Sequence, residues 1–142
     1  MSAPLASTNP GKMMAAKVDE EVAAYRELQE QVTQLRSDQQ TLMGQQNENE
    51  MVKQELDMLD DTSIVYKMVG PVLTKNDLDD AKQTVEKRLE YITGELKKIE
   101  RKAKDSEAKM DETGKKIQEM QGAMQQAAAA AAREIQQQAA QG

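Results

Sequence analysis

The strongest constraint on the fold of this chain is an uninterrupted heptad repeat in its second half. One row of the repeat contains Leu89, Leu96, Ala103, Met110, Ile117 and Met124. A second row contains Val85, Ile92, Ile99, Ser106, Thr113 and Met120. The two rows alternate at steps of four and three, which is typical of a helix that packs along another helix in a coiled coil. We therefore predict a helix over residues 76–124, with Asn76 as its N-cap.

The first half of the chain carries a less regular seam. It contains Val18, Val22, Tyr25, Leu28, Val32, Leu35 and Leu42. This spacing predicts a helix over residues 13–60. Three polar residues, Gln39, Gln46 and Asn49, fall on the same stripe. They either loosen the middle of the helix pair or fix the register of the two helices.

Between the two seams lie two aliphatic runs separated by Gly70-Pro71. A two-residue loop between such runs predicts a β-hairpin over residues 63–75, with Val69 opposite Val72. Both faces of this hairpin are apolar, and a two-stranded sheet alone is marginally stable in water. We therefore expect it to pair with hairpins of other chains, most economically in a closed barrel. The expected assembly residues are Ile64, Val65, Tyr66, Met68, Val69, Val72 and Leu73. The alternative is a connecting loop at the end of an ordinary coiled coil.

The predicted fold is mainly α: a long antiparallel pair of helices joined by a single hairpin. Folding back at the hairpin places residues opposite each other when their numbers add to about 137. Val18 then lies near Glu119, and Met14 lies near Ala123. Residues 1–12 are expected to form a flexible arm, although Asn9-Pro10 could instead begin the first helix. Residues 125–142 form a low-complexity Ala/Gln tail.

The composition excludes several classes of function. The chain has no cysteine and no histidine, so the cysteine nucleophile, the commonest general base and the commonest zinc ligand are missing. Carboxylates are present, but nothing in the sequence suggests a pocket that would hold them for catalysis, and we expect no enzyme, metal or cofactor. A net charge of −6 disfavours nucleic-acid binding. No apolar run has the length of a membrane span or a signal peptide, so we expect a soluble, cytoplasmic protein without a membrane partner.

The hairpin sequence Val65–Leu73 and the segment Lys87–Ile92 resemble β-type subunits of prefoldin, and most of all the eukaryotic branch called subunit six. The resemblance covers about residues 13–124. It implies a heterohexamer with a double β-barrel base and hanging coiled coils. It further implies ATP-independent capture of unfolded proteins, such as actin and tubulin, and their delivery to the group II chaperonin.

A client-binding surface is expected where the free ends of the two helices meet. Its candidate residues are Met13, Met14, Val18, Val22, Ile117, Met120 and Met124. Methionine suits such a surface because its side chain is flexible and polarizable. The alternative is that these residues only close the end of the coil. The competing function for the whole chain is a structural coiled-coil adaptor or tether that binds one folded partner.

Overall fold

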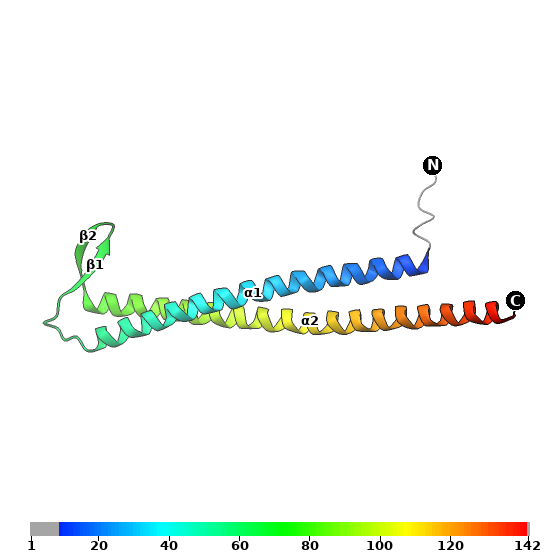
Figure 1. Cartoon of the computed structure of the whole chain (residues 1–142). Coiled ribbons are helices and arrows are strands. Elements are labelled where there is room, and N and C mark those ends of the chain that lie inside the picture. Colours follow the sequence, from blue (N-terminus) through cyan, green and yellow to red (C-terminus); the bar gives the residue numbers. More distant parts are fainter. Residues whose placement is uncertain (1–8, 142) are drawn as a thin grey trace. The chain divides into compact units, whose positions relative to one another are not determined.

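The computed structural model describes residues 9–141. Its elements are helix α1 (Pro10–Asp57), strands β1 (Val65–Val69) and β2 (Val72–Asn76), and helix α2 (Leu78–Gln141), as Figure 1 shows. The prediction of two long helices joined by one hairpin is confirmed. Residues 1–8 of the expected arm lie outside the described residues.

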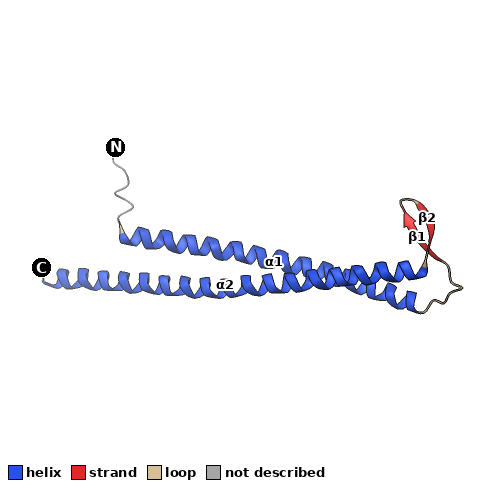
Figure 2. Cartoon of the chain, turned by 180° about the vertical axis from the view of Figure 1, so that it is seen from behind, coloured by secondary structure: helices blue, strands red, loops and turns tan. Residues whose placement is uncertain are grey.

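The chain divides into two compact units. The first unit combines residues 1–32 with residues 104–142, and the second unit consists of residues 33–103. Each unit contains a stretch of α1 and a stretch of α2, and the second also contains the hairpin (Figure 2). The two units are described separately below.

Helix α1 begins at Pro10, three residues before the expected start at Met13. The Asn9 side chain caps it, because Asn9 Oδ1 accepts a hydrogen bond of 3.0 Å from the backbone N–H of Gly11. The Asn9 carbonyl accepts the first helical hydrogen bond, from the N–H of Met13, at 3.0 Å. Proline is favoured at the position after an N-cap because it has no N–H to leave unpaired. Residues 10–12 are therefore helical, which corresponds to the alternative that Asn9-Pro10 begins the first helix and not to a flexible arm at these residues.

Helix α1 ends at Asp57, and a tight turn replaces the last residues of the expected helix. The N–H groups of Met58 and Leu59 donate to carbonyls three residues back, at 3.3 and 3.2 Å. The carboxylate of Asp60 then accepts hydrogen bonds from the N–H of Thr62 at 3.0 Å and from its hydroxyl at 2.6 Å. An aspartate that binds the backbone two residues ahead stabilises a turn. These bonds, led by those from Thr62, lower the pKa of Asp60.

The hairpin has the predicted register. Met68 lies opposite Leu73, and Val69 lies opposite Val72. The turn needs Gly70, whose φ of 59° lies in the left-handed region that side-chain-bearing residues rarely adopt. Proline then fixes the φ of the second turn position, and this combination suits a type II′ turn.

Helix α2 begins at Leu78, and its N-cap is Asp77. The N–H of Ala81 donates to the Asp77 carbonyl at 2.9 Å, which is the first helical hydrogen bond. Asn76 was the expected N-cap, but it is paired with Val65 at the end of β2. The strand runs through Asn76 and the helix begins at Leu78, so the residue directly before the helix is Asp77, which also has a capping side chain.

Within the second unit, apolar residues from three elements pack into one cluster. Its buried members are Leu56, Ala81, Val85 and Leu89, and the partly buried Leu59, Val65 and Leu78 pack against them. This cluster joins the end of α1 to the start of α2 beside the root of the hairpin. None of the described helices has a stretch long and apolar enough to span a membrane.

The Ala/Gln tail is helical as far as Gln141. It continues α2 without a break, and every residue from 125 to 141 is exposed. Alanine has the highest helix propensity of all residues, so this segment extends a helix that is already formed.

Candidate functional site

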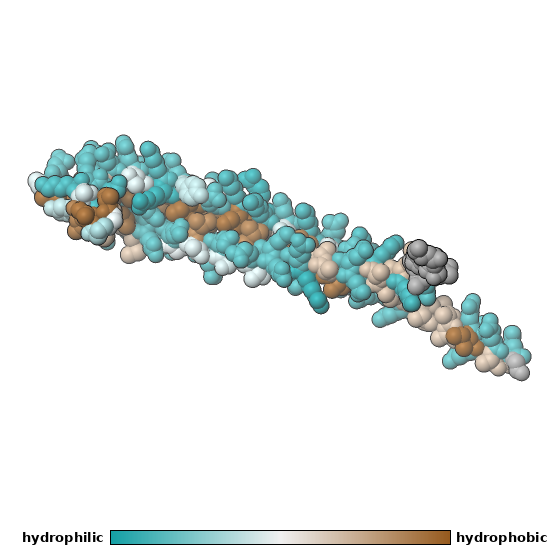
Figure 3. All heavy atoms as spheres, turned by 90° about the horizontal axis from the view of Figure 1, so that it is seen from above, coloured by the Kyte–Doolittle hydropathy of each residue, from teal (hydrophilic) through white to brown (hydrophobic). Residues whose placement is uncertain are grey.

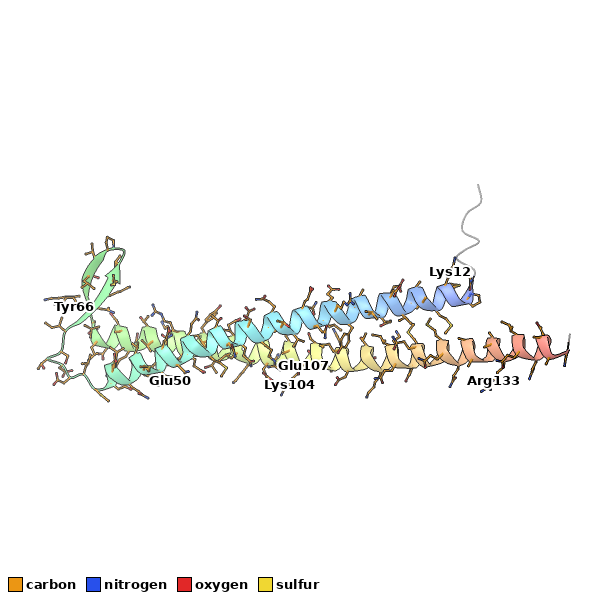
Figure 4. The ribbon with its side chains drawn as sticks, viewed as in Figure 1. Lys12, Glu50, Tyr66, Lys104, Glu107 and Arg133 are labelled. Carbon is orange, nitrogen blue, oxygen red and sulfur yellow. The ribbon has the colours of Figure 1, made fainter. Side chains whose placement is uncertain are left out.

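The hairpin presents apolar side chains to solvent on both faces. Tyr66, Met68 and Leu73 share one face, and their exposed fractions are 53%, 69% and 62%. Val69 and Val72 share the opposite face, with exposed fractions of 55% and 57%. Figure 3 shows the resulting patch of hydrophobic atoms over the hairpin, and Figure 4 shows Tyr66 on it. A patch of this kind marks an interaction site.

The hairpin also has two open edges. The described sheet consists only of β1 and β2, so each strand has one edge with unpaired backbone groups. Backbone groups on such edges are ready to pair with strands of another chain. The hairpin therefore offers both backbone and side-chain contacts to a partner.

Val65 differs from the other predicted assembly residues. It is partly buried, because it packs against the apolar cluster of the second unit. Its packing attaches the base of the hairpin to the two helices. Ile64 is its neighbour in the chain and has an exposed fraction of 61%.

The predicted client-binding residues all belong to the first unit. Met13 is exposed, and the other six are half-buried: Met14, Val18, Val22, Ile117, Met120 and Met124. Each half-buried side chain is therefore partly covered and partly open to solvent, and Met13 is the most accessible member of the set.

Two contacts show the register of the helices in the first unit. Lys116 Nζ lies 3.0 Å from Glu21 Oε1, and the two residue numbers add to the predicted 137. The Tyr25 ring lies 3.7 Å from the position that a Cβ atom on Gly114 would take. The hydrogen bond to Glu21, together with the charges of Glu21 and Glu112, raises the pKa of Lys116.

A polar network fixes the register in the second unit. One carboxylate oxygen of Glu100 accepts hydrogen bonds from Arg36 at 2.9 Å and from Gln39 at 2.8 Å. Arg36 also donates to the amide oxygen of Gln39 at 3.0 Å. The expectation that facing residue numbers add to about 137 places Gln39 beside residue 98 or 99, and it missed both partners. The network supports the interpretation that polar residues on the first seam set the register.

The end of α2, for which no role is predicted from the sequence, forms a separate exposed surface. Starting at Pro10, α1 reaches about as far as residue 127 of α2 in the observed register, so the following residues of α2 have no part of α1 opposite them. Arg133 lies on this extension, past the start of α1 marked by Lys12 (Figure 4). Ile135 is its one large apolar residue, with an exposed fraction of 67%.

Residues 9–141 contain no cluster of acidic, histidine or cysteine side chains that could hold a metal ion.

Known proteins resemble this chain along most of its length. The sequence pattern of the family described as "Prefoldin subunit" matches residues 19–124. Prefoldin subunit 6 of Mus musculus is 38% identical over 121 residues, which are 85% of this chain and 95% of that protein. Probable prefoldin subunit 6 of Caenorhabditis briggsae is 41% identical over 126 residues, which are 89% of this chain and 95% of that protein.

The fold is also similar to that of a solved structure. The prefoldin beta subunit from Thermococcus strain KS-1 matches with a TM-score of 0.68 and 24% sequence identity. The match covers 72% of this chain and 90% of that chain. At this identity the likeness concerns the fold alone.

Proposed function

Because this chain belongs to the prefoldin subunit family and is a subunit of a prefoldin co-chaperone, we propose that its hairpin joins it to other prefoldin subunits in a heterohexamer. In that assembly the free helix ends hold unfolded proteins, among them actin and tubulin, and pass them to the group II chaperonin in the cytoplasm. The function needs no ATP and no catalytic group of this chain.

One observation carries the proposal for assembly: the hairpin exposes apolar side chains on both faces and has two open edges. A simple connection between two helices would not need apolar residues on both faces. Closing the hairpins of several subunits into a barrel would bury these faces and pair the edges. This favours a barrel-forming subunit over a tether that binds one folded partner.

Met68→Asp tests the role of the hairpin, with Ile135→Asp as the matched control. The two side chains are about equally exposed in the single chain, at 69% and 67%. Neither change should alter the helix content measured by circular dichroism. Met68→Asp should exclude the chain from the reconstituted hexamer because it places a charge in the barrel, whereas Ile135→Asp should enter normally. Native mass spectrometry gives the answer, and entry of Met68→Asp at the wild-type level would refute the barrel.

The proposal for client capture rests on the methionines of the first unit. Met13 is exposed, and Met14, Met120 and Met124 are half-buried. Replacing all four with glutamine should leave assembly intact, because none of them lies in the hairpin. Suppression of client aggregation, followed by light scattering, should fall only in part because the other subunits keep their own helix ends.

The control for this experiment replaces exposed methionines of the second unit. Met43, Met51 and Met58 have exposed fractions of 50%, 62% and 84%. Their replacement by glutamine also removes exposed methionine surface but leaves the free helix ends of the first unit unchanged, so protection of the client should persist. Full protection by the first variant, with assembly verified, would show that these four methionines do not hold the client.

A further inference from the structure

A groove lies between α1 and α2 in the second unit, and most of its lining residues belong neither to the seams nor to the hairpin. Its volume is about 560 Å³, and its lining includes Gln45, Asn49, Lys87, Arg88, Tyr91 and Ile92. This volume lies within the range of protein sites that bind small molecules or a few side chains of a peptide. The groove also accounts for residues of the segment Lys87–Ile92 that do not belong to the seam. Of the segment Lys87–Ile92, only Leu89 and Ile92 are buried between the helices.

The charge of the groove is unlike that of the chain as a whole. Among the described residues, Lys87 and Arg88 are the only charged side chains that line it, and both are exposed. Neither forms an ion pair or a side-chain hydrogen bond within residues 9–141. The whole chain, by contrast, has a net charge of −6. The groove is thus a local cationic site with two side chains that commonly bind carboxylates.

A second groove in the same unit provides an internal comparison. It is lined by three acidic residues, Glu50, Glu86 and Glu90, and by two basic ones, Lys53 and Lys97. Its five charged residues sum to −1, whereas those of the first groove sum to +2. The two grooves lie between the same two helices, so their difference in charge reflects which side chains line each groove.

The uncharged residues of the first groove add apolar contact and hydrogen-bonding groups. Ile92 is buried, with an exposed fraction of 5%, and the Tyr91 side chain beside it is 67% exposed. The side-chain amide of Asn49 donates to the Gln45 carbonyl at 2.8 Å, which leaves its amide oxygen available to a ligand. Cations, an exposed ring and amide groups together suit a peptide better than an inorganic anion, because a peptide uses all three.

We propose that this groove binds an acidic peptide segment of a partner protein, with carboxylates at Lys87 and Arg88 and an apolar side chain against Tyr91 and Ile92. The net charge of the chain opposes a nucleic acid, whose many phosphates would meet only two cations here. The proposal does not depend on the hairpin or on the helix ends, so it goes beyond the function proposed above.

The test uses the full chain in its reconstituted complex and a defined probe. The probe is a synthetic peptide of alternating glutamate and leucine, blocked at both ends and labelled with fluorescein for anisotropy. Lys87→Gln combined with Arg88→Gln should weaken its binding about tenfold, because each exposed charge pair accounts for a factor of about three. Lys53→Gln combined with Lys97→Gln changes the net charge equally but in the other groove. That control should alter binding less than about twofold.

Tyr91→Ala tests the apolar contact without changing any charge. It should weaken binding of the glutamate–leucine peptide several-fold but leave binding of an all-glutamate peptide unchanged. All the substituted side chains except Lys53, which is partly buried, are exposed, so circular dichroism and native mass spectrometry should show unchanged helices and assembly. Those two measurements also separate a failure of this proposal from a failure of the proposed assembly.

The binding place is identified by cross-linking. A benzophenone in place of one leucine of the peptide should label residues that line the groove, such as Gln45 or Tyr91, when the product is mapped by mass spectrometry. Labelling elsewhere would overturn the proposal. The proposal would also be overturned if the Lys53 and Lys97 control weakened peptide binding as much as the Lys87 and Arg88 variant. It would be overturned as well if a single-stranded oligonucleotide displaced the peptide at the same concentration as unlabelled peptide does.

Discussion

The antiparallel register of the first unit can be tested by a disulfide. Glu21 and Lys116 form an ion pair, and their numbers add to 137. Leu28 and Met110, whose numbers add to 138, belong to the same register, and both are half-buried. Leu28→Cys combined with Met110→Cys should therefore form a disulfide within one chain. The natural sequence has no cysteine that could interfere.

The geometry makes this cross-link selective. A disulfide needs Cα atoms within about 7 Å, and a shift of one heptad moves a residue about 10 Å along a helix. Leu28→Cys combined with Ile117→Cys is thus the matched control, displaced by one heptad, and it should not close within the chain. A loop of about 80 residues closed by the correct pair should raise the free energy of unfolding by about 4.5 kcal/mol in the chain-entropy estimate.

Non-reducing gel electrophoresis at low protein concentration measures the yield, and thermal unfolding followed by circular dichroism measures the stabilisation. The expected product is a monomer with altered mobility that melts at a higher temperature than its reduced form. A dominant cross-link between two chains would mean that the helices pair in trans. That result would refute the folded-back arrangement. Equal yield from the displaced pair would instead refute a fixed register.

Three further predictions concern stability. Leu89→Ala removes a buried member of the apolar cluster and should destabilise the second unit by about 2–3 kcal/mol, which thermal unfolding would detect. Gly70→Ala forces a side chain into a φ of 59° and should cost about 1 kcal/mol, seen as faster amide exchange in the two strands with unchanged helices. The pKa of Asp60 is lowered by the hydrogen bonds of its turn, so the ionised carboxylate stabilises the turn at pH values above the ordinary pKa of 3.8. This stabilisation is lost as the pH falls below 3.8, and amide exchange of Thr62 should then become faster. Asp60→Asn should abolish the pH dependence.

The hairpin and its register could be predicted because the sequence leaves few alternatives. A two-residue Gly-Pro turn between two aliphatic runs allows one pairing, with Val69 opposite Val72, and the structure has it. The period of the second seam likewise identified Val85, Leu89 and Ile92, which are buried. These features depend on local geometry and on burial, and both leave a periodic trace in the sequence.

Polar partners were harder to predict than apolar ones. The register placed Gln39 beside residue 98 or 99, yet its partners are Arg36 and Glu100. Long polar side chains reach residues one or two positions away, so a register known to one residue does not determine which atoms meet. The groove beside Tyr91 was missed for a different reason: Lys87 and Arg88 follow no hydrophobic period.

The end of α2 is helical although no hydrophobic period predicts a helix there. A hydrophobic period reports what a helix packs against, and residues beyond about 127 of α2 have no part of α1 opposite them. They are nevertheless helical, although an isolated helix of this length is marginal in water. The cost of starting a helix does not apply here, because the preceding turns of α2 are already formed. Each added residue needs only a favourable propagation step, which the run Ala127–Ala132 provides better than any other composition.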